Sequence, residues 1–188
     1  MSDLSPAHAP KSALRARRVA SPLRLFGYFS LGFAPVLALL AACAQPAPTA
    51  DTQIRERIAF IRASILARDA AGIVHWAVDD WTFVDGAGKS YDKAAYLVRT
   101  RALMDRIVAV DSLDSHVDSL TVTGDTAAVE LSQTMERRER DPASARILHV
   151  RLRYHEKQTW ILTPTAGWCV RRVAFTGPPE RTELAPSP

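Results

Sequence analysis

The hydrophobic pattern of this chain changes its period near residue 107, and this change constrains the fold more than any other feature. Before it, Ile54, Ile58, Ile61 and Ile65 recur on one face of a helix. After it come four long segments of strand-forming residues separated by turn sequences: 107–122, 126–138, 146–162 and 168–176. Helices followed by a strand meander predict an α+β fold, with the N-terminal helices packed on one face of an antiparallel sheet.

Polar residues that favour helix N-termini mark the start of each expected helix. Asp51 or Thr52 can cap a first helix that runs to about Arg68. Asp69 can cap a second helix through Trp76, and Asp92 a third through Met104. A short strand and a Gly-containing turn are expected between the last two helices, at 80–84 and 85–88.

The first 42 residues have the order of a secretory signal peptide: a basic stretch, an uncharged apolar run and a few small residues. The apolar run is about 16 residues long, shorter than the roughly 20 that a membrane-spanning helix needs. It ends Leu40-Ala41-Ala42-Cys43, which resembles the lipobox of bacterial lipoproteins, where the cysteine receives a lipid. We therefore expect lipidation at Cys43. An ordinary cleavage site with an incidental cysteine is the alternative.

Domain boundaries and location follow from this assignment. We expect a signal peptide at 1–42, a lipidated Cys43 with a Pro-rich tether at 43–51, one domain at 52–177 and a disordered tail at 178–188. Many lipoproteins that stay in the inner membrane have Asp after the cysteine, whereas this chain has Ala44. The resemblance therefore implies a lipid-anchored protein of the cell envelope, at the outer membrane and facing the periplasm.

The net charge of the chain comes largely from its N-terminal segment. The sequence has 24 Lys and Arg and 20 Asp and Glu, but 19 of each follow residue 42. The basic isoelectric point is therefore no argument for nucleic-acid binding, and we expect no nucleic-acid partner. Cys169 is the other cysteine, so a lipid on Cys43 would leave no intramolecular disulfide.

Two stretches resemble the nuclear transport factor 2-like (NTF2-like) superfamily, particularly its SnoaL-like and ketosteroid isomerase-like members. One is Arg-Asp-Ala-Ala-Gly-Ile at 68–73 leading to Asp-Asp-Trp-Thr-Phe-Val-Asp-Gly-Ala-Gly at 79–88, and the other is Gly-Trp-Cys-Val-Arg-Arg-Val at 167–173. The resemblance implies a curved sheet that closes with the helices into a cone around an apolar pocket. The superfamily includes isomerases, dehydratases and many non-catalytic domains, so the fold does not choose a function.

Asp85 is the candidate catalytic residue. By resemblance to ketosteroid isomerases it lies where those enzymes hold a proton-abstracting carboxylate, and on a strand it would share a face with Trp81 and Phe83. Desolvation there would raise its pKa towards that of a useful base. The oxyanion donors of those isomerases, however, correspond to Ile61 and Thr159 here. The alternative is that Asp85 opens the Gly-containing turn and binds nothing.

Other polar groups give weaker signals, and we expect neither a metal nor a cofactor. Gly88-Lys89-Ser90 has Phe83 where a phosphate-binding loop requires glycine. His149 and His155 are six residues apart on one strand, about 20 Å at strand rise, which is too far to share a metal. The polar run 111–118 lies along one strand and is expected to be solvated.

Aromatic and basic side chains complete the set of candidates. Six aromatic residues are expected to line the pocket: Trp76, Trp81, Phe83, Tyr91, Tyr96 and Tyr154. Six arginines on adjacent strands are expected to form a basic outer face that pairs with Glu130, Glu136 and Glu156: Arg137, Arg138, Arg151, Arg153, Arg171 and Arg172.

Two functional hypotheses follow. The first is a non-catalytic envelope lipoprotein, anchored to the membrane by its lipid, that binds a small apolar ligand or a protein partner through the cone. Dimerisation through the outer face of the sheet is a further expectation. The second is a SnoaL-type or isomerase-type enzyme that uses Asp85 as general base. Convergence of Asp85 with His75 or Tyr91 in an open pocket would favour the enzyme, whereas a filled cone would contradict both the enzyme and the small-ligand hypothesis.

Overall fold

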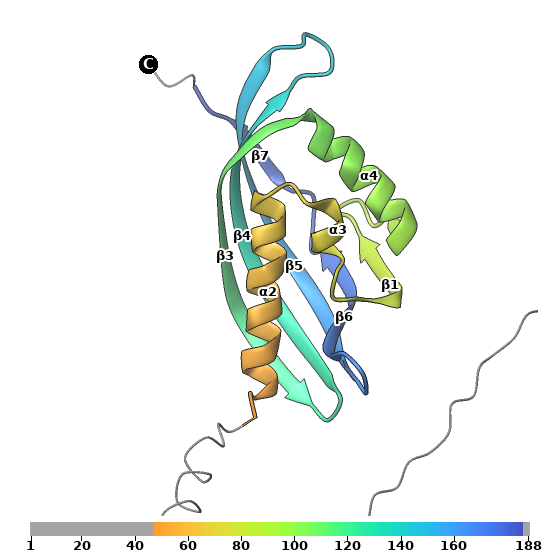
Figure 1. The fold of residues 1–188 in the computed structure, drawn as a ribbon. Helices are drawn as coiled ribbons and strands as arrows, with labels where there is room; N and C mark the ends of the chain where they lie inside the picture. Colours follow the sequence, from red (N-terminus) through yellow and green to blue (C-terminus); the bar gives the residue numbers. More distant parts are fainter. Residues whose placement is uncertain (1–46, 186–188) are drawn as a thin grey trace, which may run out of the picture. The chain divides into compact units, whose positions relative to one another are not determined.

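The computed structural model describes residues 47–185 (Figure 1). The predicted signal peptide, the predicted lipidation site Cys43 and the first part of the predicted tether lie outside the described residues. The elements, in chain order, are α2 (Ala50–Leu66), α3 (Ala70–Ile73), β1 (Ala77–Val84), β2 (Ser90–Asp92), α4 (Lys93–Arg106), β3 (Ile107–Thr123), β4 (Thr126–Arg140), β5 (Ile147–Thr163), β6 (Gly167–Phe175) and β7 (Glu180–Glu183).

Polar side chains cap each of the three helices within residues 47–185. The predicted caps Asp69 and Asp92 are confirmed, because each accepts a hydrogen bond from a backbone N–H in the first turn of its helix. The predicted cap of the first helix is wrong. Thr49 caps α2 by accepting from the N–H of Thr52 at 3.2 Å, so the domain begins before residue 52 and the tether is shorter than expected. The second helix is also shorter, because α3 ends at Ile73.

The sheet is mixed rather than antiparallel. Its strand order is β2-β1-β6-β5-β4-β3, and β7 pairs with β5. The predicted meander from β3 to β6 is antiparallel throughout, but β1 pairs with β6 in parallel. The reason is that β1 precedes the meander and joins its far edge, where β6 runs in the same direction. An antiparallel sheet was therefore the wrong prediction for this one pairing.

The three longest strands bend around the helices. Strands β3 to β5 have 15–17 residues each, and the pairing of β3 with β4 has three register shifts. Such bulges increase local bend and twist. Figure 1 shows the resulting curved sheet with the helices on its concave side. The sheet stays open and does not close into a barrel.

The core lies between α2 and the concave face of the sheet. Ile54 and Ile58 of α2 pack in one buried cluster with Val129 and Leu131 of β4 and with Trp160 of β5. Buried residues of β4 alternate strictly from Ala127 to Glu139, which is the period of two expected for a half-buried strand. The side chains of β4 that point inward therefore include polar ones as well as apolar ones.

The C-terminal segment is part of the domain. Residues Glu180–Glu183 form β7, which pairs with Val150–Arg153 of β5 just beyond the part of β5 that β6 covers. The predicted disordered tail is thus wrong for residues 178–185. The four prolines of this segment predicted disorder, but none of them lies within residues 180–183. This short run supplies backbone donors to an otherwise unpaired edge of β5. Among residues 47–185, no helix is both long enough and apolar enough to cross a membrane.

Candidate ligand-binding cavity

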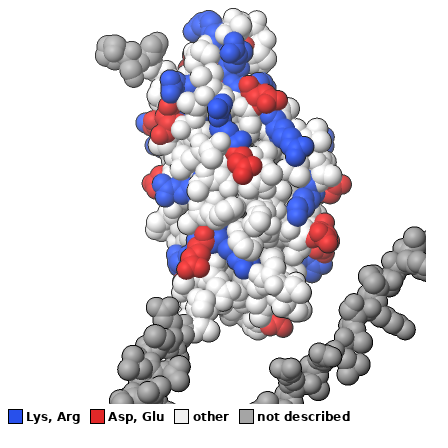
Figure 2. All heavy atoms as spheres, in the orientation of Figure 1, with Lys and Arg blue, Asp and Glu red and all other residues white. Residues whose placement is uncertain are grey.

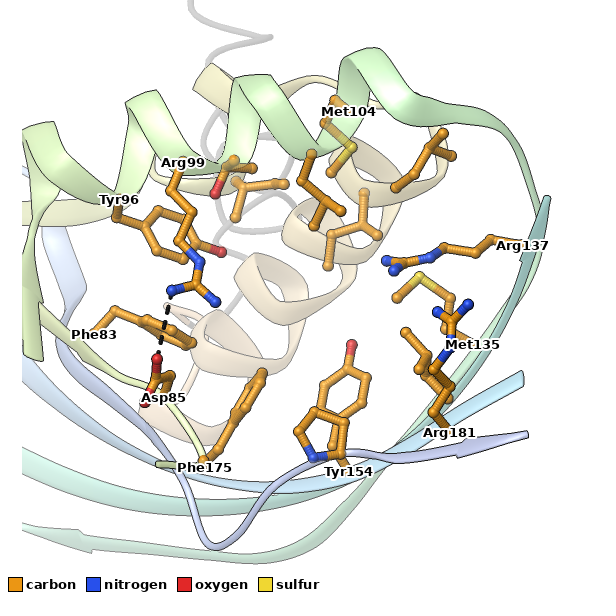
Figure 3. Close-up of a pocket in the computed structure, with 18 of the residues that line it drawn as sticks. Phe83, Asp85, Tyr96, Arg99, Met104, Met135, Arg137, Tyr154, Phe175 and Arg181 are labelled. Atoms are coloured by element: carbon orange, nitrogen blue, oxygen red, sulfur yellow. Dashed lines mark hydrogen bonds and ion pairs between the residues drawn. The ribbon is translucent and has the colours of Figure 1, made fainter. Parts of the chain in front are cut away.

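A cavity of about 550 Å³ lies between the helices and the concave face of the sheet (Figure 3). Its volume falls within the range of about 300–1,000 Å³ that small-molecule sites occupy. Most of its lining is apolar: Ile65, Ile73, Phe83, Gly86, Ala87, Tyr96, Leu103, Met104, Ile107, Val110, Met135, Leu152, Tyr154, Phe175, Pro178 and Pro179. The polar members of the lining are Asp85, Arg99, Thr100, Arg137 and Arg181. The side chains therefore do not fill the cone.

Aromatic rings form a continuous wall along one side of this cavity. Phe83 lies between Tyr96 and Phe175, with ring centroids 4.9 and 5.1 Å apart, and Phe175 contacts Tyr154 at 4.9 Å. Burial raises the pKa of the Tyr96 and Tyr154 hydroxyls, so both rings are neutral at physiological pH. The wall offers apolar surface with two hydroxyl groups in it.

The structure separates the six predicted pocket aromatics into two groups. The three that line the cavity are Phe83, Tyr96 and Tyr154. Trp81 is instead in the core, at 4% exposure. Trp76 lies under the guanidinium of Arg57, 4.0 Å from its ring centroid. Tyr91 is not in the cavity lining, although its hydroxyl contacts a residue that is.

That residue is Asp85, at the end of β1. Its Oδ1 accepts hydrogen bonds from the N–H groups of Ala87 and Lys89, both at 3.0 Å. Its Oδ2 accepts from the Tyr91 hydroxyl at 3.1 Å and lies 3.4 Å from Arg99 Nη1. Asp85 therefore opens the turn, as in the alternative considered above, and it also faces the cavity beside a second ionisable group.

The electrostatics of Asp85 differ from the expectation. The backbone hydrogen bond from Lys89 lowers the pKa of the carboxyl, and partial desolvation opposes this effect. The hydrogen bonds from Tyr91 and Ala87 and the charge of Arg99 lower the pKa further. The expected rise of its pKa is wrong. The reason is that the turn brings amide donors and a guanidinium to a carboxylate that stays close to solvent.

A buried ion cluster occupies the opposite end of the cavity. Arg137 and Glu139 are 7% and 4% exposed, and the Glu139 carboxylate accepts from Arg137 Nε at 2.7 Å and from Arg181 Nη1 at 2.6 Å. Arg137 is therefore not on a basic outer face, as the sequence suggested. Arg138, its neighbour on β4, does face outward and pairs with Asp111, because adjacent strand residues point to opposite faces.

Glu156 is the second residue that the prediction placed on the wrong face. It is 7% exposed and lies beneath α2, lining a small cleft with Ile58 and Ile61. Burial raises the pKa of its carboxyl to about 7, while hydrogen bonds from Gln158 and Gln133 counteract this rise. Glu136, in contrast, forms an expected cross-strand ion pair with Arg151, and the exposed Glu130 pairs with Lys157 rather than with one of the six arginines.

A hydrogen-bonded polar network surrounds Glu156. Gln158 Nε2 donates to Glu156 Oε1 at 2.6 Å, and Gln158 Oε1 accepts from Trp160 Nε1 at 2.8 Å. Gln133 Oε1 accepts from the hydroxyl of Tyr154, a cavity-lining residue, at 3.2 Å. The inward alternation of Tyr154, Glu156, Gln158 and Trp160 on β5 is visible in the sequence, and it was the signal that could have placed Glu156 inside.

On the outer face, four polar side chains from three strands meet. Ser132 Oγ donates to Asp118 Oδ2 at 2.5 Å and lies 2.9 Å from His155 Nδ1, while His116 Nδ1 lies 2.9 Å from Asp118 Oδ1. In a hydrolase triad the serine proton faces the histidine, and a carboxylate orients that histidine. Here the serine proton faces the carboxylate, so the cluster lacks the geometry of a nucleophilic site.

Surface charge is mixed on the face that Figure 2 shows, where basic and acidic side chains are interspersed. Exposed ion pairs such as Arg171 with Asp80, 2.6 Å apart, mix the two signs of charge in the same way. Within residues 47–185, His, Cys, Asp and Glu side chains form no group of three or more suited to holding a metal ion.

Comparison with known proteins supports the fold. No protein-family model matches the sequence, and no curated protein matches it significantly. Solved structures do match. An NTF2-like protein of unknown function in nutrient uptake from Rhodospirillum rubrum ATCC 11170 is 22% identical, with a TM-score of 0.52 over 66% of this chain and 97% of that one.

Two further structures have the same architecture. An NTF2-like superfamily protein from Salmonella enterica serovar Typhimurium LT2 is 18% identical, with a TM-score of 0.53 over 72% of this chain and 95% of that one. A ketosteroid isomerase-like protein from Erwinia carotovora atroseptica SCRI1043 is 12% identical, with a TM-score of 0.52 over 71% and 95%. The predicted resemblance is confirmed at the level of fold: residues 47–185 form an NTF2-like α+β domain.

Proposed function

We propose that this chain is an envelope lipoprotein whose NTF2-like domain binds a small, largely apolar ligand in its cavity without catalysing a reaction. The observation that carries the proposal is the unfilled cavity of about 550 Å³ with its aromatic and aliphatic lining. Apolar cavities of this size with a few convergent polar groups are the usual form of small-molecule sites. The lipobox resemblance at Cys43 supports the envelope location.

Binding in the cavity can be tested with a neutral apolar dye. The chain from residue 44 to 188 contains every element and the whole core described above, and Nile red should bind to it with increased fluorescence. Met135→Trp should weaken this binding, because Met135 lines the cavity and the larger ring would occupy it. Thr134→Trp is the matched control, since Thr134 neighbours it on β4 and is absent from the lining. Equal dye affinity in a folded Met135→Trp variant would contradict the proposal.

The enzyme hypothesis remains the second candidate because Asp85 meets the Tyr91 hydroxyl at an open cavity. Its lowered pKa makes Asp85 a weak base, which is why we favour binding. Turnover of a β,γ-unsaturated ketosteroid to its conjugated isomer, followed by ultraviolet absorbance, tests this candidate. Turnover that disappears in Asp85→Asn would establish the enzyme and overturn the non-catalytic proposal.

A further inference from the structure

The two ends of the cavity differ in charge. At one end Arg99 faces Asp85, so a single cation is matched by a single anion. At the other end two guanidinium groups, those of Arg137 and Arg181, share the single carboxylate of Glu139. Figure 3 shows these groups on opposite sides of the apolar space. Among the described residues, the ion pairs at the second end therefore join two positive charges to one negative charge.

Part of this charge cluster is buried, namely the pair of Arg137 with Glu139. Arg137 is 7% exposed, its Nε donates a hydrogen bond to Glu139 Oε2 at 2.7 Å, and its Nη2 lies 2.6 Å from the same oxygen. Glu139 Oε1 is occupied by Arg181. Burying a charge is costly unless it is paired, and the pair of Arg137 with Glu139 would be neutral without Arg181. The third charge, that of Arg181, is 42% exposed at its side chain, so water offsets part of its cost, and its position in the cavity lining lets it meet an anion there.

We infer that the ligand is an amphiphile with one carboxylate head, which lies against Arg137 and Arg181 while its apolar body occupies the rest of the cavity. This inference rests on the proposed function. A monoanion would neutralise the cluster, and guanidinium groups bind carboxylates through paired N–H donors. A dianionic head would leave the cluster negative, so a carboxylate fits better than a phosphate monoester.

The lining matches the rest of such a molecule. The rest of the lining includes aliphatic side chains from α4, β3 and β4, among them Leu103, Ile107 and Met135. Met104 and Val110 are only partly buried although they face the cavity. Covering them would remove apolar surface from water, which is the main driving force for binding an alkyl or ring system.

Isothermal titration calorimetry at pH 7.5 with decanoate and 1-decanol separates charge recognition from apolar binding. The two probes have the same chain length, and they differ in the charge of the head. We expect decanoate to bind the 44–188 chain roughly tenfold more tightly than decanol, since a hydrogen bond to a charged group contributes an amount of this order.

Variants locate the effect. Arg181→Met should weaken decanoate binding by roughly tenfold and so reduce the preference for decanoate over decanol. Arg181 is on a short, exposed edge strand, so this variant should fold. Arg153→Met is the matched control, because Arg153 is exposed on the neighbouring strand and absent from the lining. Glu139→Gln should tighten decanoate binding, since it increases the positive charge of the cluster.

The outcomes distinguish this inference from the proposed function. Equal affinities for decanoate and decanol, or no loss of decanoate binding in Arg181→Met, would overturn the carboxylate assignment and leave the apolar cavity as a binding site. If Nile red binds and neither ten-carbon probe does, the carboxylate assignment is also overturned. Failure of all three probes to bind would overturn the proposed function as well.

Discussion

The hydroxyl of Tyr91 donates a hydrogen bond to Oδ2 of Asp85 across the turn that joins β1 to β2. This contact links the two residues that the sequence offered as a catalytic carboxylate and a pocket aromatic. Together with the turn amides it makes Asp85 a hydrogen-bond acceptor at both oxygens. The carboxylate thus organises the rim of the cavity.

Substitutions at Asp85 should separate its structural and chemical roles. Asp85→Asn keeps an oxygen that can accept from the turn amides, so we expect nearly unchanged thermal stability and unchanged ligand occupancy in native mass spectrometry. Asp85→Ala removes that acceptor and should lower the melting temperature. Loss of ligand in the folded Asp85→Asn variant would instead place the charge of Asp85 in the binding site.

Gly86 should be intolerant of a larger side chain. A Cβ atom there would clash with the carbonyl oxygen of Gly177 and the Cα of Pro178, so Gly86→Ala must displace backbone at the rim. We expect the free energy of unfolding, measured by urea titration, to fall by about 1–3 kcal/mol. Gly177→Ala has no atom within 4 Å of the added carbon and is the matched control. Equal effects of the two substitutions would refute the close approach.

Glu156 should make stability depend on pH. Its pKa is raised from 4.5 to about 7 in the folded domain, so the folded state binds more protons than the unfolded state between these values. The free energy of unfolding should therefore fall as pH rises from about 4.5 to about 7, by an amount on the order of 3 kcal/mol.

Glu156→Gln removes this titration and supplies the control. The variant should be more stable than the parent above pH 7 and should lack the decline that Glu156 causes. Urea unfolding at pH 5, 6, 7 and 8 measures both proteins. A constant difference between them across this range would show that the carboxyl does not titrate there.

The proposed lipid anchor on Cys43, which precedes the described residues, can be tested by substitution. If Cys43 carries a lipid, Cys43→Ser should abolish lipid attachment and leave the precursor uncleaved, so that no lipid-anchored mature chain accumulates in the membrane fraction. Metabolic labelling with a radioactive fatty acid, followed by fractionation and immunoblotting, measures both effects. Unchanged label and membrane association in Cys43→Ser would exclude lipidation at this residue.

Much of the fold was predictable because local signals agree with the final structure. Asp69 and Asp92 cap helices as expected, and the change of period at Ile107 coincides with the start of β3. The parallel pairing of β1 with β6 was not predictable from local sequence, because it joins residues about ninety positions apart. The pairing of β7 with β5 was not predictable from local sequence either, because it also joins residues that are not neighbours along the chain.

The candidate site was less predictable than the fold. Phe83 and Tyr96 were expected in the pocket because the family resemblance implies an apolar cone that aromatic residues can line, and they line the cavity. Arg137 and Glu156 were assigned to the outer face on their charge, although alternation along β4 and β5 places both inside. For these two residues the strand period predicted burial better than residue polarity did. A polar side chain is buried when its position in the strand alternation faces the core.

The pairing of β7 with β5 has a consequence for how fragments of this protein should be chosen. Pro178, Pro179 and Arg181 belong to the wall of the cavity, yet they follow the last strand of the meander. A shortened chain ending at Phe175 would keep α2 to β6 and their core. Spectroscopic measurements of its secondary structure should therefore resemble those of the full chain. The shortened chain would nevertheless lack one side of its binding site, so an intact signature of folding in such a fragment says little about its ability to hold a ligand.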